Sequence, residues 1–453
     1  MVRTSVSLSA ASRASLAVLL SAMPLFASSH SGSRIEFGPG DSLTPDQPRV
    51  FVAFEDPLTG VVPGPSEIFN AFVLDTGANA TLVGASGYFD LNALDFNPDL
   101  YGIEQRTDPD AIEQFGPVVR YAEQGVAGVE IFDLLSPYHI DYVGHNGDIL
   151  GNHTAGPVQE ISSSRALGAP DVDLGGYAGI IGMPGMDDKI TVFDLTTMTI
   201  APSFLGYIAV DFPNAVPALT PDSYHVDLLE LAPIFTGQVH PGDPLPAFSP
   251  LPLVPGVGAA ANGLTTTGKF LLDSGAQLTM IGSDFLAAIG KDPVADAVDF
   301  IEVGGIGGSK TVPLVEIEEF VISTNEGVDL VIDDLIVGVL DIPGLSIGGI
   351  LGMNVLAGGY LQNVLVSDAN GMFDQVVLDF TGSQWSMRLD VNSNYVPQVL
   401  PNGVGGFEER ALLAVDVGQI SPEPGSLLLI SIAAGGLCVR RRGCRQNRSL
   451  CRL

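Results

Sequence analysis

The stretch FVLDTGANATLVG (residues 72–84) recurs with few changes as FLLDSGAQLTMIG (residues 270–282). Seven of the aligned positions are identical, and five more carry residues of similar type. Two shorter blocks follow each copy in the same order. They are GIIGMP (179–184) and VFDL (192–195) after the first copy, and GILGMN (349–354) and VLDF (377–380) after the second. Three blocks repeated in one order indicate an internal duplication, and therefore two similar lobes.

Between the repeated blocks, short apolar runs alternate with polar residues and are bounded by Gly and Pro. Residues 50–54, 138–143 and 314–322 are examples. A period of two is typical of half-buried strands, so the sequence predicts a mostly β chain. One short helix is predicted, at residues 284–289.

The repeats also predict the domain boundaries. We expect the first lobe over residues 45–215 and the second over residues 216–395, with the junction near residues 212–222. Residues 241–255 carry six prolines. We expect them to form a long surface loop within or entering the second lobe.

Composition excludes several classes of protein. The chain has 453 residues, 46% of them hydrophobic, with 52 acidic against 19 basic residues and a net charge of −33. A surface this negative repels phosphate, so we expect no nucleic-acid partner. All three cysteines (Cys438, Cys444 and Cys451) lie in or beside the basic C-terminal segment. Zinc fingers and cysteine-nucleophile enzymes are therefore excluded from the body of the chain.

The N-terminus has the layout of a secretory signal peptide, predicted over residues 1–28. Arg3 and Arg13 precede the apolar run ASLAVLLSAMPLFA (residues 14–27), and small residues follow it. The alternative is a soluble N-terminal helix, which Pro24 and the abrupt polar exit disfavour. The pattern predicts that the mature chain is exported.

The C-terminus carries a second candidate targeting segment. After a predicted linker (residues 401–421), SPEPG leads into the apolar run SLLLISIAAGGLCV (residues 426–439) and then three arginines. About 14 apolar residues are few for a hydrocarbon core of roughly 30 Å, but the arginines would hold the end of the run at the cytoplasmic face.

The order Pro-Glu-Pro, apolar run, Arg cluster resembles the PEP-CTERM sorting signal of bacteria, here over residues 422–443. The resemblance implies transient membrane attachment and processing by an exosortase-type enzyme, in addition to signal peptidase at the other end. The mature protein would then be at the cell envelope or surface, or secreted. The alternative is a plain C-terminal anchor, which would also place the body outside the cytoplasm.

Each long repeat ends an apolar run with an aspartate, Asp75 or Asp273. Burying a carboxylate there costs several kcal/mol unless something compensates. The duplication would bring the two aspartates face to face, and carboxylates that close cannot both ionise. The ionised one could then take a proton from water while the protonated one donates to a substrate carbonyl.

The residues that follow each aspartate have supporting roles. We expect the hydroxyls of Thr76 and Ser274 to bond across the junction. Gly77 and Gly275 permit the turn and leave room between the two acids.

Asp-Thr-Gly and Asp-Ser-Gly, each with a later apolar-apolar-Gly, resemble the two half-sites of the pepsin-like and retroviral-type aspartic proteases. The resemblance covers most of residues 45–390. It implies the bilobal β fold with the active site between the lobes, and peptide hydrolysis with Asp75 and Asp273 catalytic. Gly182 and Gly352 would belong to the segments that close behind the catalytic loops. A polypeptide substrate, no cofactor, no metal and a monomer follow from the same resemblance. The alternative function is a non-catalytic surface or matrix protein that kept the fold.

Both motifs continue with alanine (Ala78 and Ala276), where pepsins tend to have a hydroxyl residue. Such a hydroxyl would stabilise the ionised carboxylate. Its absence leads us to expect higher pKa values for the aspartate pair than in a pepsin-like site. The negative charge of the body acts in the same direction, but we expect the local hydrogen-bond effect to dominate over it.

Two glycine clusters are candidate flap tips by resemblance: Gly304, Gly305, Gly307 and Gly308 in the second lobe, with Gly125 and Gly128 as a looser counterpart in the first. Pepsins set a tyrosine on their flap, and Tyr121 is the nearest candidate. An ordinary hairpin turn explains either cluster equally well.

Deleting residues 422–453 is expected to release the body as soluble protein with unchanged activity, because nothing in this segment belongs to either repeat. Fractionation and an activity assay of the truncated protein check this. Recovery of the truncated chain only as unfolded aggregate would show that the tail is part of the fold.

Overall fold

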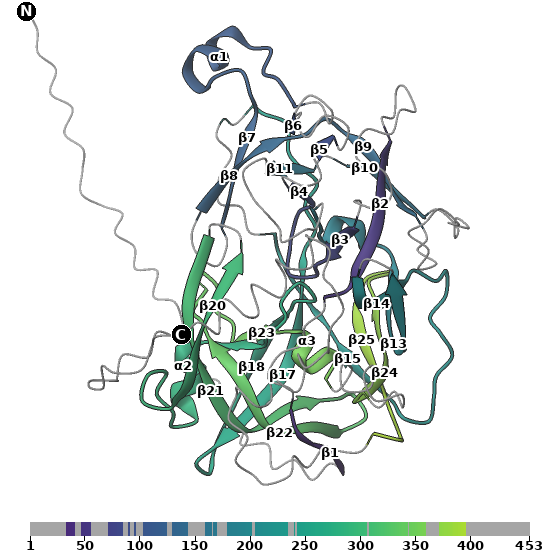
Figure 1. Ribbon diagram of the computed structural model, residues 1–453, viewed down its shortest axis with the longest axis vertical. Helices are drawn as coiled ribbons and strands as arrows, with labels where there is room; N and C mark the ends of the chain where they lie inside the picture. Colours follow the sequence, from purple (N-terminus) through teal and green to yellow (C-terminus); the bar gives the residue numbers. More distant parts are fainter. Residues whose placement is uncertain are drawn as a thin grey trace, which may run out of the picture. The chain divides into compact units, whose positions relative to one another are not determined.

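The computed structural model describes residues 33–40, 47–55, 71–84, 89–90, 95–96, 103–124, 129–143, 159–164, 166–169, 179–201, 204–233, 240, 242–305, 308–342, 344–358 and 371–395. Strands dominate these residues, and they form three main sheets (Figure 1). The predicted mostly β fold class is therefore confirmed.

The first repeat builds a nine-stranded sheet in the order β10-β9-β2-β3-β12-β4-β11-β8-β7. Its strands are β2 (Arg49–Glu55), β3 (Ala71–Leu74), β4 (Leu82–Gly84), β7 (Arg120–Gln124), β8 (Val129–Leu134), β9 (Tyr138–Val143), β10 (Gln159–Ser164), β11 (Leu167–Ala169) and β12 (Gly179–Ile181). Helix α1 (Pro109–Phe115) precedes β7, the 3-10 turn η4 (Met183–Gly185) follows β12, and β5 (Phe89–Asp90) pairs only with β6 (Asp95–Phe96) among the described strands.

The second repeat builds another nine-stranded sheet, in the order β1-β22-β19-β23-β18-β17-β21-β20, with β16 also paired to β17. Its strands are β1 (Ser33–Pro39), β16 (Leu229–Leu231), β17 (Leu251–Ala261), β18 (Leu264–Leu272), β19 (Met280–Ile281), β20 (Ala297–Gly305), β21 (Gly308–Ser323), β22 (Val328–Val339) and β23 (Gly349–Leu351). Helices α2 (Ser283–Ala288) and α3 (Met353–Leu356) follow β19 and β23.

The repeated sequence blocks pair in the same way in both halves. β12 runs parallel to β3, with Gly179 opposite Phe72, and antiparallel to β4. β23 runs parallel to β18, with Gly349 opposite Phe270, and antiparallel to β19. Equal pairing and equal register make the two halves structural repeats of one unit.

A third sheet takes strands from both halves, in the order β14-β13-β24-β25-β15. Its members are β13 (Ile190–Ala201), β14 (Phe204–Asp211), β15 (Ser223–Asp227), β24 (Phe373–Asp379) and β25 (Ser386–Val391). β13 and β24 contain the VFDL and VLDF blocks and pair antiparallel, with Val192 opposite Val377. The last repeated block thus joins the two halves through backbone hydrogen bonds.

The strands predicted at residues 50–54, 138–143 and 314–322 are confirmed as β2, β9 and part of β21. The helix predicted at residues 284–289 is confirmed as α2, which buries Phe285 and Leu286.

The prediction of a surface loop over residues 241–255 is wrong for its C-terminal third. Strand β17 begins at Leu251 and contains Pro252 and Pro255. Pro252 stands opposite Glu230 on the short strand β16, and Pro255 lies where the register between β17 and β18 shifts. A bulge or a short neighbouring strand is where a sheet tolerates a residue without an N–H donor.

Strand β1 comes from residues that the sequence assigned to neither lobe. It runs parallel to β22 in the second-half sheet, and Arg34 forms an ion pair with Glu319 at 3.0 Å. Phe37 is 2% exposed and meets Phe373 and Tyr395 edge to face, with ring centroids 5.5 and 5.8 Å apart. The segment that follows the predicted signal peptide therefore belongs to the folded core.

Within the part of the chain that the structure describes, no helix is both long and apolar enough to cross a bilayer. The predicted signal peptide, the linker and the PEP-CTERM segment lie outside the described residues.

Replacing Phe37 by alanine is expected to lower the free energy of unfolding by about 3–5 kcal/mol, the usual cost of removing a buried aromatic ring. Urea unfolding of the full chain measures it. The matched control is Val129→Ala on β8, where the side chain is 54% exposed, and its effect should stay within about 0.5 kcal/mol. Equal effects of the two substitutions would mean that β1 is not docked as described.

Candidate active site

The two repeated aspartates stand at the ends of equivalent strands. Asp75 follows β3, and its N–H donates to the carbonyl of Ile181 at 2.9 Å. Asp273 follows β18, and its N–H donates to the carbonyl of Leu351 at 3.0 Å. In each half, the backbone therefore leaves its parallel pair of strands at the aspartate.

Thr76 and Ser274 connect the two turns by four reciprocal hydrogen bonds. The Thr76 hydroxyl donates to the carbonyl of Leu272 at 2.7 Å, and the Ser274 hydroxyl donates to that of Leu74 at 2.6 Å. In return, the N–H of Ser274 donates to the Thr76 hydroxyl at 3.0 Å and the N–H of Thr76 to the Ser274 hydroxyl at 3.1 Å. Both side chains are fully buried. The structure thus contains the cross-junction bonds that the sequence led us to expect.

Gly77 and Gly275 let the opposite carboxyl group approach the backbone. A Cβ on Gly77 would stand 2.5 Å from Cγ of Asp273, and one on Gly275 would stand 2.4 Å from Cγ of Asp75. Real Cβ atoms do not come so close to another carbon, so any side chain at either glycine would push the carboxyl groups out of place.

Gly182 and Gly352 lie directly behind the two turns. A Cβ on Gly182 would stand 2.2 Å from the carbonyl oxygen of Ala80, and one on Gly352 would stand 2.9 Å from that of Ala276. The residues that follow each glycine bond to the turns, since Met183 donates to the Ala78 carbonyl and Met353 to the Ala276 carbonyl, both at 2.8 Å. The apolar-apolar-Gly segments therefore pack against the backbone of the aspartate turns.

The carboxyl groups of Asp75 and Asp273 are half-buried and hydrogen-bonded to each other. Loss of solvent around them raises the pKa of both. For Asp273 the charge of Asp75 and the shared hydrogen bond raise the pKa further, to well above the usual value. For Asp75 that same bond lowers the pKa and partly offsets the effect of desolvation. Both groups therefore hold a proton more readily than a free aspartate does, and Asp273 is the one whose pKa the pair raises further.

Each carboxyl group also accepts a hydrogen bond from the backbone of its own turn. The N–H of Gly77 donates to Oδ1 of Asp75 at 2.7 Å, and the N–H of Ala276 donates to Oδ1 of Asp273 at 2.9 Å. A bond of this kind favours the charged form and lowers a carboxyl pKa.

The pKa values of both aspartates are raised from the ordinary value of an aspartate, and loss of solvent is the largest cause for each. Ala78 and Ala276 lack hydroxyls, yet their backbone N–H groups still act on the carboxyl groups and lower their pKa. The comparison with a pepsin-like site, and the dominance of the local hydrogen bond over the charge of the body, stay predictions.

Two further polar residues contact the site and were missed by the sequence analysis. Asn354 Oδ1 accepts from both the N–H and the hydroxyl of Thr279 at 2.7 Å, and the Thr279 hydroxyl accepts from the N–H of Gly352. Gln47 donates its side-chain amide to the carbonyl of Gly275. The difference between GILGMN and GIIGMP was the available signal for Asn354, while Gln47 lies outside the repeated blocks.

The candidate flap residues lie on two antiparallel hairpins. β7 and β8 form the first, and Tyr121 on β7 is buried opposite Phe132. β20 and β21 form the second, where Gly304 pairs with Ser309 and Gly305 with Gly308. Gly125, Gly128 and Gly307 lie outside the described residues. Gly304, Gly305 and Gly308 therefore lie at the end of a hairpin, which fits a flap and an ordinary turn alike.

Among the described residues, no group of three or more His, Cys, Asp or Glu side chains is arranged to hold a metal ion.

Comparison with known proteins agrees with this geometry in the second half of the chain. Residues 257–355, which include Asp273 and Gly352, match the family model described as "Aspartyl protease". No curated protein sequence matches the chain significantly. The crystal structure of basic 7S globulin from soybean matches 75% of this chain and 95% of its own at 11% identity, with a TM-score of 0.33. The family match and the mostly β architecture together are consistent with an aspartic-protease fold and, at family level, with an aspartic-type hydrolase.

Asp273→Asn is expected to stabilise the protein relative to wild type at neutral pH, with the gain vanishing in acid. The folded-state pKa of Asp273 is raised, so above the ordinary value of about 4 the folded state keeps a proton that the unfolded state has released. The stability that this group supports is complete below the unfolded pKa and is lost as the pH rises through the folded pKa. Urea unfolding of wild type and variant measures the difference. The pH should run from about 4, near the ordinary pKa of an aspartate, to about 7.

Asp292→Asn is a control of opposite sign. Backbone N–H donors from Ala295 and Val294 lower the pKa of this exposed carboxyl, so its substitution should cost stability at neutral pH and nothing in acid. A neutral-pH loss of stability in Asp273→Asn would contradict the raised pKa.

Proposed function

We propose that this chain is an exported aspartic endopeptidase in which Asp75 and Asp273 activate water between them. The observation that carries the proposal is the hydrogen bond between the two half-buried carboxyl groups, on turns that are tied together through Thr76 and Ser274. Two acids held in contact cost folding stability, and a catalytic role would explain why the pair is present. The match of residues 257–355 to an aspartyl protease family supports the same conclusion.

In the proposed reaction the two carboxyl groups have different tasks. Ionised Asp75 takes a proton from a water molecule, whose oxygen forms a bond to the carbonyl carbon of the scissile peptide. Protonated Asp273 donates its proton to the carbonyl oxygen, which gives a neutral gem-diol. When the diol collapses, the C–N bond breaks, the nitrogen takes the proton from Asp75, and a diol hydroxyl returns its proton to Asp273.

The proposed substrate is an extended polypeptide. In the described structure β7 and β20 each end the strand order of their sheet, so an edge of each candidate flap hairpin carries no neighbouring strand there. Edge strands present backbone N–H and C=O groups that an extended peptide can pair with. Both half-sites come from one chain, which supports a monomer as the active form.

Export is proposed from the two ends of the sequence. A signal peptide over residues 1–28 would direct the chain out of the cytoplasm, and the PEP-CTERM segment over residues 422–443 would hold it at the membrane until an exosortase-type enzyme acts. Strand β1 (Ser33–Pro39) lies close behind the proposed signal peptide in the sequence.

Asp75→Asn and Asp273→Asn are each expected to reduce cleavage of an unfolded protein substrate at least about a thousandfold, because each removes one of two groups that must exchange protons with the substrate. The double variant should lose little more than either single variant, since the pair acts as a unit. Rates across the acid to neutral range measure this. In parallel, binding of a hydroxyl-containing peptide that mimics the gem-diol should disappear in Asp75→Asn.

Asp379→Asn is the matched control. Asp379 also belongs to a repeated block and is half-buried like the aspartate pair, but it accepts hydrogen bonds from Thr381 within its own turn. This variant should keep its activity within about twofold, as surface substitutions usually do. An inactive wild-type protein that does not bind the peptide mimic would instead favour a non-catalytic protein with this fold.

A further inference from the structure

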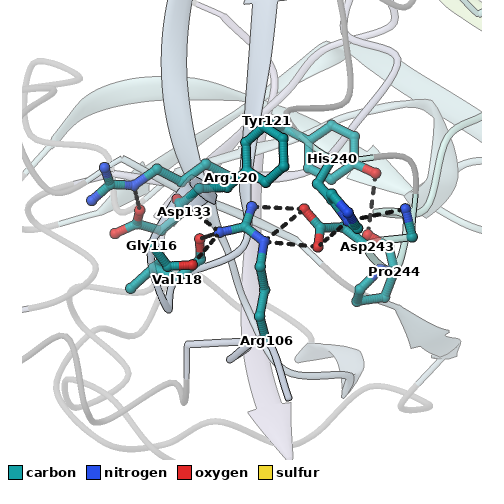
Figure 2. A network of polar contacts seen from close by, with 11 residues as sticks. Arg106, Gly116, Val118, Arg120, Tyr121, Asp133, His240, Asp243 and Pro244 are labelled. Atoms are coloured by element: carbon teal, nitrogen blue, oxygen red, sulfur yellow. Dashed lines mark hydrogen bonds and ion pairs between the residues drawn. The ribbon is translucent and has the colours of Figure 1, made fainter. Parts of the chain in front are cut away.

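A short segment from the second half of the chain lies on elements of the first half. We call residues 242–249 the strap. The segment directly precedes β17 of the second-half sheet, yet its partners include Arg106, Tyr121 and Asn79. Figure 2 shows Asp243 and Pro244 of the strap facing Arg106 and Tyr121. The strap is thus the loop that the sequence predicted ahead of the second-lobe strand, and its contacts with the first half are what the sequence did not predict.

The strongest contact is an ion pair between Arg106 and Asp243. Arg106 Nε donates to Oδ1 at 2.9 Å and Nη2 to Oδ2 at 2.7 Å, which is a two-pronged arrangement. The side chains are 2% and 3% exposed. Charge-assisted bonds of this geometry are strong and fix direction as well as distance.

Arg106 also organises the chain that leads into β7. Its Nη1 donates to the carbonyl of Phe115 at 3.1 Å, to that of Gly116 at 2.8 Å, and to that of Val118. These carbonyls lie at the end of α1 and in the loop before β7. One guanidinium therefore holds both the strap and the entry to the first hairpin.

His240 borders the same pair. Its Nδ1 lies 3.6 Å from Oδ1 of Asp243, and its ring lies 5.0 Å from that of Phe115. The carboxylate of Asp243 thus has a second basic side chain at its edge, as Figure 2 shows.

The middle of the strap packs on Tyr121. The Tyr121 hydroxyl donates to the carbonyl of Pro244 at 3.1 Å, and its ring meets that of Phe248 edge to face at 6.1 Å. Phe248 also packs against the small core of the first hairpin, which includes Phe132 and Leu134. The polar tip and the ring of Tyr121 are therefore both held by the strap.

The far end of the strap reaches the first aspartate turn. The N–H of Ser249 donates to the carbonyl of Asn79 at 3.2 Å, and its hydroxyl donates to Asp187 at 3.0 Å. Asn79 belongs to the repeated block that starts with β3 and contains Asp75. A single segment thus contacts the entry to β7, the side chain of Tyr121 and the turn of the catalytic candidate.

We propose that the strap fixes the β7–β8 hairpin relative to the Asp75 turn, and that Arg106, Asp243 and Tyr121 are positioning residues for binding of the peptide. The proposal rests on the proposed function and adds to it. A displaced hairpin would weaken binding of ground state and transition state alike, so the Michaelis constant should rise while the turnover number changes little.

Asp243→Asn tests the proposal in the full chain, with Asp390→Asn as its matched control. Asp390 pairs with Arg388 at 2.9 Å, and these side chains are also 2% and 3% exposed, but they lie on β25 in the shared sheet. Both variants remove one charge from an equally buried pair, so both should destabilise the fold. Only Asp243→Asn should raise the Michaelis constant for an unfolded protein substrate, by about tenfold, with the turnover number within about threefold.

Hydrogen exchange supplies a readout that does not depend on catalysis. Amide exchange in residues 120–124 should accelerate at least about tenfold in Asp243→Asn and remain unchanged in Asp390→Asn, because only the first variant releases the hairpin locally. Equal acceleration in the two variants, or none in Asp243→Asn, would overturn the proposal. So would faster exchange with an unchanged Michaelis constant in an active enzyme.

Asp243→Asn leaves Arg106 without its charged partner, and the cost could prevent folding. Tyr121→Phe is the second variant for that case. This variant keeps the ring contact with Phe248 and removes only the bond to the Pro244 carbonyl. A smaller effect of the same kind, about threefold in exchange and in the Michaelis constant, is expected for one neutral hydrogen bond. If Tyr121→Phe changed neither the exchange rate nor the Michaelis constant, the proposed role of the strap would be contradicted. A wild-type protein without peptidase activity would contradict the proposed function, and the exchange measurements alone would then decide on the strap.

Discussion

The reciprocal hydroxyl bonds of Thr76 and Ser274 are the constraint on which the candidate site depends. Two half-buried carboxyl groups repel each other when ionised, and nothing in the β3 or β18 strand alone would keep them in contact. The four bonds are short, fully buried and directed at backbone groups, so they fix the two turns rather than only the side chains. Gly77 and Gly275 have no Cβ atom, which would otherwise clash with the opposite carboxyl group.

The hydroxyl bonds can form because the duplication is present in the structure as well as in the sequence. Equal pairing of β3 with β12 and of β18 with β23 delivers each aspartate at the same point of an equivalent sheet. Pairing of β13 with β24 then joins the halves through the last repeated block. The protein therefore builds one site from two copies of a half-site, and either copy alone would expose an acid with no partner.

The sequence predicted the fold class, the aspartate turns and the bonds between Thr76 and Ser274, because each of these features is local and occurs twice. It did not predict β1, the shared sheet or the strap. The contact between Arg106 and Asp243 spans 137 positions of the sequence and occurs once. Asp243 also lies in a proline-rich stretch, which favours a loop at the level of sequence but says nothing about what that loop contacts. Long-range contacts without a repeat leave no pattern from which they could be inferred.

The two halves are alike at the aspartates and unlike around them, and the differences act in one direction. The charge of Asp75 raises the pKa of Asp273, whereas the hydrogen bond between them lowers that of Asp75. Asn354 contacts the second turn through Thr279, where the first half has Pro184, and the strap contacts the first turn through Asn79. A symmetric pair of acids would share its proton equally, which gives no preferred base. Unequal surroundings favour the proton on Asp273 over Asp75, and this asymmetry between the duplicated halves is the physical basis of the proposed division into an acid and a base.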